Sequence, residues 1–274
     1  MPLARLMGGT YFGKVVHKVY EKVDFAADPL DAEVARVVQK VVTGSVLRRE
    51  HGNLIRGVEL SLRTPLGGAL GSTRLADIGA GDRLSELTFE MTLADWAKRS
   101  RVADIGRALE ESLLAAGRAD DPLVGYAQEI ASHGFTTDLK GLMNGSIDSL
   151  LRVENAGQRE LWITDYKSNR LDKDGDETLI SGYGAGSMLN EMFHHHYPLQ
   201  ALIYGTAVNR YLRSRAGATG APHVVRGFAY LFIRGMVGES TPHDGAGNRN
   251  GVVTWVAPDG LWDTLSDVMM GAHR

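Results

Sequence analysis

A carboxylate and an ammonium group lie two residues apart at the end of an apolar run, at Asp165 and Lys167 in segment 161–169. Alternation along a strand would put both side chains on one face, roughly 7 Å apart. That separation leaves room for a metal ion and a water molecule. A lone Asp-x-Lys triplet is more often an ion pair at a strand end, so this spacing alone indicates a catalytic site only weakly.

A second carboxylate strengthens the case for a metal site. Asp148 lies late on the strand expected before the one that carries Asp165, and a hairpin would bring the two together. Two carboxylates at one sheet edge repel each other unless a cation lies between them. Oxygen ligands without thiolates favour Mg²⁺ or Mn²⁺. The alternative is a solvated loop aspartate, but Gly145 argues mildly against it because glycine in a strand often marks a bulge or a close backbone approach.

Two helical patterns could supply further groups. Gly13, His17 and Glu21 are spaced i, i+4 and i+8, so they share one helix face where a neutral imidazole could bind a metal. A surface or capping pair between His17 and Glu21 is the commoner arrangement. Gln200 and Tyr204 lie one helical turn apart, where an amide and a phenol could contact a phosphate or a base. Taken alone, these two are ordinary helix residues.

The elements that must position these groups follow from hydrophobic periodicity. Helices are expected over about 11–24, 34–41, 102–113, 198–213 and 260–270, with a shorter helix ending near 132. Strands are expected over 84–93, 139–153, 160–167, 224–233 and 252–256. Residues 63–82, 172–186 and 238–251 are rich in glycine and are expected as loops. This order predicts an α/β or α+β core, in which helices flank a mixed sheet.

Composition narrows the possible functions. The chain has 274 residues and a formal net charge of −3 at pH 7, which excludes a histone-like grip on nucleic acid by bulk charge but not a local basic groove. Two groups of arginines are candidates for such a groove: Arg99, Arg101 and Arg107, and Arg210, Arg213 and Arg215.

Several kinds of site and targeting segment are excluded or unsupported. The chain has no cysteine, which excludes disulfides, cysteine nucleophiles, thiolate zinc sites and a cysteine-ligated iron–sulfur cluster. Neither GxxxxGK[ST] nor a GxGxxG after a strand occurs, so no nucleotide site is expected. The charged residues in the first thirty positions argue against a signal peptide, and no apolar stretch reads as a membrane span. We expect a cytoplasmic protein.

Taken in order, these motifs resemble those of the PD-(D/E)xK nucleases. The chain carries GxxxHxxxE at 13–21, a carboxylate after a glycine, DYK at 165–167 and QxxxY at 200–204. It is most similar to the RecB-type branch, through RLSELTFEM at 83–91, YPLQ at 197–200 and YLFIRG at 230–235. The resemblance extends from about residue 9 to the end. It implies one nuclease domain over 1–274 with a restriction-endonuclease-like core and a helical insertion at about 95–135.

The resemblance also implies roles for individual residues. Asp148 and Asp165 would bind Mg²⁺, with help from the Tyr166 carbonyl, and His17 would complete the metal shell. Lys167 would steady the attacking hydroxide or the charge of the phosphorane.

Other positions in the matching blocks have weaker implied roles. Gln200 and Tyr204 would position DNA. Glu86 and Glu90 lie on the strand before the hairpin, where alternation would put both on one side. The weaker candidates are Glu21, Glu86, Glu90, His195 and Arg234.

The implied activity is a Mg²⁺-dependent deoxyribonuclease of the exodeoxyribonuclease V type, with Mn²⁺ as a possible substitute. Such an enzyme hydrolyses phosphodiester bonds during double-strand-break end processing and recombinational repair. Its implied partners are single-stranded DNA ends, a RecB-type helicase region and RecC- and RecD-like subunits. The helicase motor is missing here, so we expect a separated nuclease domain or an orphan paralogue.

Two alternatives come from other classes. One is a catalytically inactive nuclease-like module that binds DNA or partner subunits, although intact Asp148, Asp165 and Lys167 favour activity. The other is an unrelated metal hydrolase, which would leave the QxxxY helix unexplained.

Overall fold

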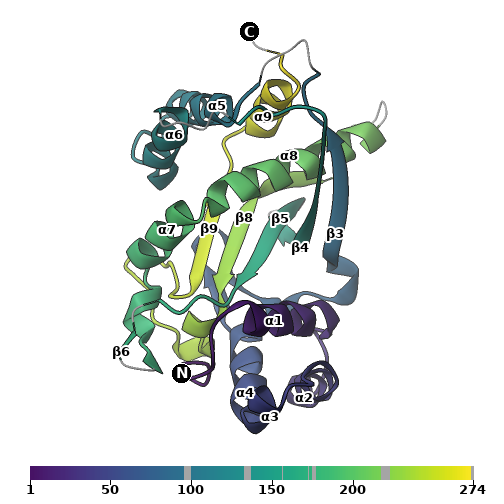
Figure 1. Cartoon of the computed structure of the whole chain (residues 1–274), viewed down its shortest axis with the longest axis vertical. Coiled ribbons are helices and arrows are strands. Elements are labelled where there is room, and N and C mark those ends of the chain that lie inside the picture. Colours follow the sequence, from purple (N-terminus) through teal and green to yellow (C-terminus); the bar gives the residue numbers. More distant parts are fainter. Residues whose placement is uncertain are drawn as a thin grey trace.

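A five-stranded mixed sheet forms the centre of the protein (Figure 1). The computed structural model describes residues 1–95, 100–132, 137–155, 157–171, 173–174, 177–216 and 223–272. The strand order is β3-β4-β5-β8-β9, and only the β5–β8 pair is parallel. The strands are β3 (Arg83–Thr92), β4 (Leu142–Asn155), β5 (Gln158–Lys167), β8 (Val224–Phe232) and β9 (Val252–Val256). The predicted fold class, a mixed sheet flanked by helices, is confirmed.

Two layers of helices cover the sheet, one on each face. Helices α7 (Ala185–His194) and α8 (Tyr197–Ala216) form the crossover that the parallel β5–β8 pair requires, and α8 lies across one face (Figure 1). Pro198 fits the first turn of α8, where its missing N–H costs nothing. The other face carries α1 (Thr10–Lys22), α2 (Leu30–Val41), α3 (Ser45–Arg49) and α4 (His51–Leu62).

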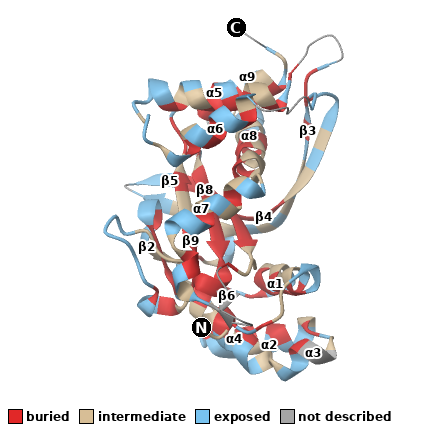
Figure 2. Cartoon of the chain, turned by 60° about the vertical axis from the view of Figure 1, so that its left-hand side comes forward, coloured by how far each residue is buried: buried red, intermediate tan, exposed pale blue. Residues whose placement is uncertain are grey.

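The sheet therefore separates two hydrophobic cores. Ile163 and Phe228 belong to the core under α8, whereas Trp162 and Leu231 join the core that contains Val16 of α1. Neighbouring residues of β5 thus point into different cores, as strand alternation requires. Buried residues are concentrated on the central strands, and the edge strand β3 is mostly half-buried or exposed (Figure 2).

A helical pair lies within the region where an insertion was expected. Helices α5 (Val102–Ala115) and α6 (Pro122–Ser132) pack on each other, and α5 also packs on α9 (Leu261–Met269). Residues 96–99 and 133–136, near the expected ends of the insertion, lie outside the described residues. No helix in the described ranges is long and apolar enough to cross a membrane.

Some elements differ from those expected. No helix or strand is expected over 45–62, but α3 and α4 form there. The expected loop at 63–82 holds β1 (Pro65–Gly67) and β2 (Gly71–Arg74). The expected loop at 172–186 holds the short strands β6 (Lys173–Asp174) and β7 (Glu177–Thr178) and the start of α7. Tertiary packing decides these segments, because buried side chains such as Leu54, Met188 and Met192 anchor the helices.

Candidate active site

Three carboxylates meet in one row where β4 separates from β5. The register pairs Ser149 with Thr164, so Asp148 and Asp165 stand at the next position along their strands. On the other side of β4 the pairs on either side of Glu86 place it opposite Asp148. Glu86 has a φ of 51°, a left-handed conformation that is uncommon outside glycine and typical of functional sites.

His17 of α1 completes a compact group with two of these carboxylates. Its Nδ1 lies 3.1 Å from Asp148 Oδ2, and ligand atoms of His17, Glu86 and Asp148 all lie within 4.8 Å of one another. They line a hollow of about 720 Å³. The Tyr166 backbone N–H donates to Asp148 Oδ2 at 3.1 Å and fixes that carboxylate.

Electrostatics in the hollow favour a bound cation. Burial lowers the pKa of His17, but the hydrogen bond and the negative charge of Asp148 outweigh burial and raise it above its usual value. The imidazole thus carries a proton more readily than a free histidine. A metal ion that binds there would displace this proton, because only neutral imidazole is a ligand.

Lys167 and Asp165 form a buried ion pair beside this group. The Lys167 Nζ lies 2.6 Å from Asp165 Oδ1, and Asp165 is 3% exposed. Burial raises the pKa of Asp165 to about 6, and the charge of Lys167 opposes this rise. The ammonium group lies 3.9 Å from the centre of the Tyr197 ring and 5.2 Å from that of Tyr230, where cation–π attraction holds it.

The compact group differs from the ligand set that the resemblance implies. Glu86, a weaker candidate, joins it, whereas Asp165 lies outside it with Lys167. The Tyr166 side chain packs against Tyr20, with 4.3 Å between ring centres, so only its backbone faces Asp148. In the sequence, Glu86 is indicated only by its place in the block at 83–91. The alternation rule does not predict its left-handed backbone conformation.

Gln200 and Tyr204 are linked by hydrogen bonds to Tyr230, one of the two tyrosines whose rings contact Lys167. The Gln200 amide donates to the Tyr204 hydroxyl at 3.0 Å, and Gln200 Oε1 accepts from the Tyr230 hydroxyl at 2.9 Å. Gly145 allows the strand to approach them, because a Cβ there would lie 2.7 Å from the Phe89 ring and 3.4 Å from Tyr204. The close approach at Gly145 is therefore made by aromatic side chains, and not by another backbone as the glycine had suggested.

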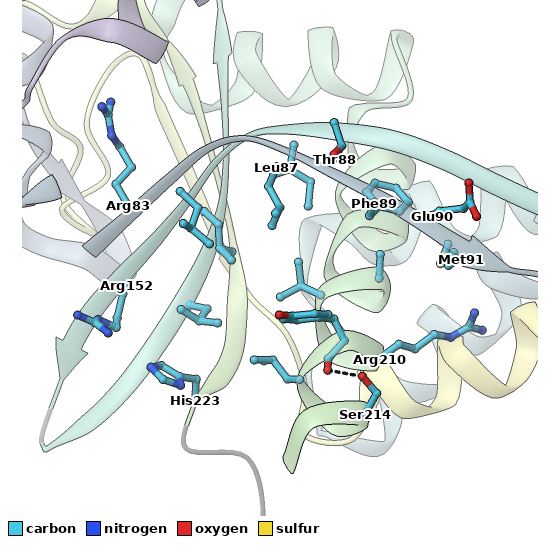
Figure 3. Close-up of a pocket in the computed structure, with 18 of the residues that line it drawn as sticks. Arg83, Leu87, Thr88, Phe89, Glu90, Met91, Arg152, Arg210, Ser214 and His223 are labelled. Atoms are coloured by element: carbon cyan, nitrogen blue, oxygen red, sulfur yellow. Dashed lines mark hydrogen bonds between the residues drawn. The ribbon is translucent and has the colours of Figure 1, made fainter. Parts of the chain in front are cut away.

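Glu90 lies apart from the compact group. It lines a second, mostly apolar pocket of about 840 Å³ between β3 and α8 (Figure 3). Glu86 instead lines the hollow beside His17. Exposure alternates along β3, where Glu86 and Glu90 take exposed positions and Leu87 and Phe89 pack on the core under α8. This pattern agrees with the expectation that alternation puts Glu86 and Glu90 on one side, two pairs apart along the strand.

The remaining candidates contact neighbouring groups, and Glu21 among them also lines the hollow beside His17. Glu21 accepts from Lys18 at 2.6 and 2.8 Å. His195 lies 3.2 Å from Glu191 and stacks on Tyr197 with 5.3 Å between ring centres. Arg234 is 1% exposed. Its guanidinium donates to the backbone carbonyls of Leu3, Leu6, Met7 and Ser168.

The two expected basic stripes are partly neutralised by carboxylates. Arg107 pairs with Asp104 and Arg101 with Asp138, while Arg99 lies outside the described residues. In the second stripe, the Arg213 guanidinium lies 2.7 Å from Asp263. Arg210 donates to the carbonyls of Thr92 and Ser266, and Arg215 lies over the Tyr211 ring.

The fold and this row of charged groups define a class. A mixed sheet with its acidic residues and lysine at the end of the central hairpin is consistent with a PD-(D/E)xK-like core. No family model matches the chain. Several curated proteins, however, are similar to it in sequence.

The most informative matches are to RecB, and they confirm the resemblance. The RecBCD enzyme subunit RecB of Mycobacterium tuberculosis is 40% identical over 274 residues, 98% of this chain and 24% of that protein. The subunit of Mycolicibacterium smegmatis is 38% identical over 275 residues, with the same shares. That of Escherichia coli is 27% identical over 224 residues, 82% of this chain and 16% of that protein. The chain is thus homologous to part of RecB, and spans about a quarter of the mycobacterial subunits.

Proposed function

We propose that this protein is a Mg²⁺-dependent DNA nuclease, the nuclease part of a RecBCD-like complex that processes double-strand-break ends for recombinational repair. One observation carries the proposal. His17, Glu86 and Asp148 converge in one hollow, directly beside the Lys167–Asp165 pair. The relatives are named as subunits of the RecBCD enzyme, which agrees with this role.

The donor atoms suit a hard divalent cation. One imidazole and two carboxylates offer nitrogen and oxygen ligands without a thiolate, a set that accepts Mg²⁺ or Mn²⁺. His17, Glu86 and Asp148 would hold the ion, with Asp165 and the Tyr166 carbonyl as further donors. Bound Mg²⁺ supplies a Lewis acid that polarises a phosphoryl oxygen and lowers the pKa of water.

The chain's own residues provide positive charge and orientation. The ammonium group of Lys167 supplies a fixed charge where the phosphoryl oxygens gain negative charge during attack. Tyr197 and Tyr230 keep that group at the site, since their rings lie beneath it. Gln200 holds Tyr230 through its hydroxyl. It therefore positions the lysine's support, besides the role in positioning DNA that the resemblance implies.

The charge distribution of this chain favours a DNA substrate that other domains or subunits deliver to the site. The chain has a net charge of −3, and carboxylates pair with Arg107 and Arg213, one arginine of each expected stripe. Single-stranded DNA ends fit this distribution if a RecB-type helicase region and RecC- and RecD-like subunits deliver them. Such a division of labour also agrees with a chain that corresponds to 24% of its mycobacterial relative.

A cleavage assay tests the proposal. End-labelled single-stranded DNA is incubated with the purified chain in Mg²⁺ or in EDTA, beside Lys167→Ala and the control Lys40→Ala on α2. We expect cleavage in Mg²⁺ alone, a loss of about 10²–10³-fold in Lys167→Ala and none in Lys40→Ala. Thermal melting checks that the variants fold.

Two results would contradict the proposal. Full cleavage by a folded Lys167→Ala variant would remove this site from the reaction. DNA binding without cleavage, even after addition of the helicase and partner subunits, would instead identify an inactive binding module.

A further inference from the structure

The outer face of α1 carries one aromatic ring and a row of cations. Tyr11, Lys14, Lys18 and Lys22 are spaced i, i+3, i+7 and i+11, so they share one face, and all four are exposed. The opposite face of the helix is buried in the core through residues such as Val16. We call Tyr11, Lys14 and Lys18 the α1 stripe.

The α1 stripe borders the candidate active site. Lys14 and Lys18 line the same hollow as His17, Glu86 and Asp148. Side chains one helical turn apart have Cβ atoms about 5–6 Å apart, so two cations stand at neighbouring positions along the rim. Tyr11 lies one turn before Lys14, is 42% exposed, and has its hydroxyl beside Gly44.

Along the outer face of α1 itself, the lysines outnumber the carboxylates that pair with them. Glu21 holds Lys18 through both oxygens and lies 3.6 Å from Lys22. In the described part of the chain, Lys14 has no carboxylate partner. Three lysines thus share one glutamate. The expected arginine stripes differ, since Arg107 and Arg213 each have a carboxylate of their own.

We infer that a single strand of DNA runs along the α1 stripe into the hollow, with phosphates on Lys14 and Lys18 and a base stacked on Tyr11. The inference rests on the proposed nuclease function and adds the path of its substrate. Cations that follow a phosphate backbone, together with an exposed aromatic ring, are the combination that binds single strands without sequence preference. The path ends at His17, which lies between the two lysines in the sequence and lines the same hollow.

Salt dependence of binding tests the path directly. Each phosphate contact contributes about 0.7 to the slope of log association constant against log salt for a single strand. We would measure this slope by fluorescence anisotropy in EDTA, with the full chain and a labelled oligothymidylate. The variants are Lys14→Gln, Lys14→Gln with Lys18→Gln, and Tyr11→Ala, with Lys40→Gln and Tyr211→Ala as controls.

The expected results differ between the variants. Lys14→Gln should reduce the slope by about 0.7 and the double variant by more. Tyr11→Ala should weaken binding about fivefold to a hundredfold at every salt concentration without changing the slope. Glu21→Gln should strengthen binding, because it frees Lys18 from its counter-ion.

Two outcomes would overturn the path, and cleavage separates them. If the wild-type chain cleaves DNA in Mg²⁺ but Lys14→Gln and Tyr11→Ala bind like wild type, the strand takes another route and the nuclease function stands. If the wild-type chain neither binds nor cleaves single-stranded DNA, even with its partner subunits, the function fails together with the path.

Discussion

Replacing Arg234 by methionine should destabilise the protein by about 3–5 kcal/mol. The guanidinium is buried and donates to four backbone carbonyls. One of these, Ser168, directly follows Lys167, and the other three lie in the segment that leads into α1 and His17. A single side chain therefore connects the segments that carry both halves of the candidate active site.

The magnitude follows from two opposing contributions. Hydrogen bonds from a charged donor are worth about 1.5–3 kcal/mol each, so four would exceed the predicted loss. Burial of the guanidinium costs several kcal/mol and offsets part of this gain. Burial also lowers the pKa of Arg234 to about 10, which still leaves the group charged at neutral pH. The net loss is a large fraction of the roughly 5–15 kcal/mol that stabilises a typical domain.

Urea unfolding followed by circular dichroism measures this loss. Arg234→Lys keeps the charge but has three donors for four carbonyls, so its midpoint should fall between those of Arg234→Met and wild type. Arg36→Met is the control, because Arg36 pairs with Glu33 at the surface. At temperatures where Arg234→Met is still folded, its DNA cleavage should be weaker than that of wild type. Stability within 1 kcal/mol of wild type, with full cleavage, would refute the bracing role.

Three further predictions follow from the site. Gly145→Ala should destabilise the chain by about 1–3 kcal/mol in thermal melts, and Phe89→Leu should relieve this, because the added Cβ would lie 2.7 Å from the Phe89 ring. Asp165 has a pKa of about 6 when folded against about 3.9 when unfolded. The folded chain thus binds the extra proton, and its unfolding free energy in EDTA should fall by about 2 kcal/mol as pH rises from 4 to 6, an effect that urea titrations should find missing in Asp165→Asn. Glu86→Gln should weaken Mg²⁺ binding at least about tenfold by calorimetry, while Glu90→Gln should leave it unchanged.

Local patterns predicted the elements whose own sequence determines them. The apolar stripes of α1, α2 and α5 repeat at three and four residues, and the β4–β5 hairpin has alternating strands around a polar turn. Helix α4 was missed although Leu54, Val58 and Leu62 share one face, because glycines interrupt its sequence. Gly57 is required there, since a Cβ would clash with Leu3. That contact joins distant segments and has no local signal.

The candidate active site shows the same division. The position of Asp148 opposite Asp165 follows from the hairpin, which is a local feature. The left-handed backbone angle of Glu86 has no signal in the sequence, because the alternation rule assumes extended backbone. The pairing of Arg101 with Asp138 and of Arg213 with Asp263 joins residues far apart in the sequence, so the arginine blocks alone did not show that part of their charge is compensated. A charged block in a sequence therefore predicts a binding surface only when its distant partners are known.

The two hydrophobic cores support different groups of the candidate active site. His17 projects from a helix packed on one core, which contains Val16 and Tyr166. Lys167 rests on Tyr230, which belongs to the other core. The metal-binding group and the lysine are therefore supported from opposite faces of the sheet, and they meet only where β4 separates from β5. A cavity made in one core should weaken metal binding or lysine placement separately. Arg234, which connects the segments leading to both, should affect the two together.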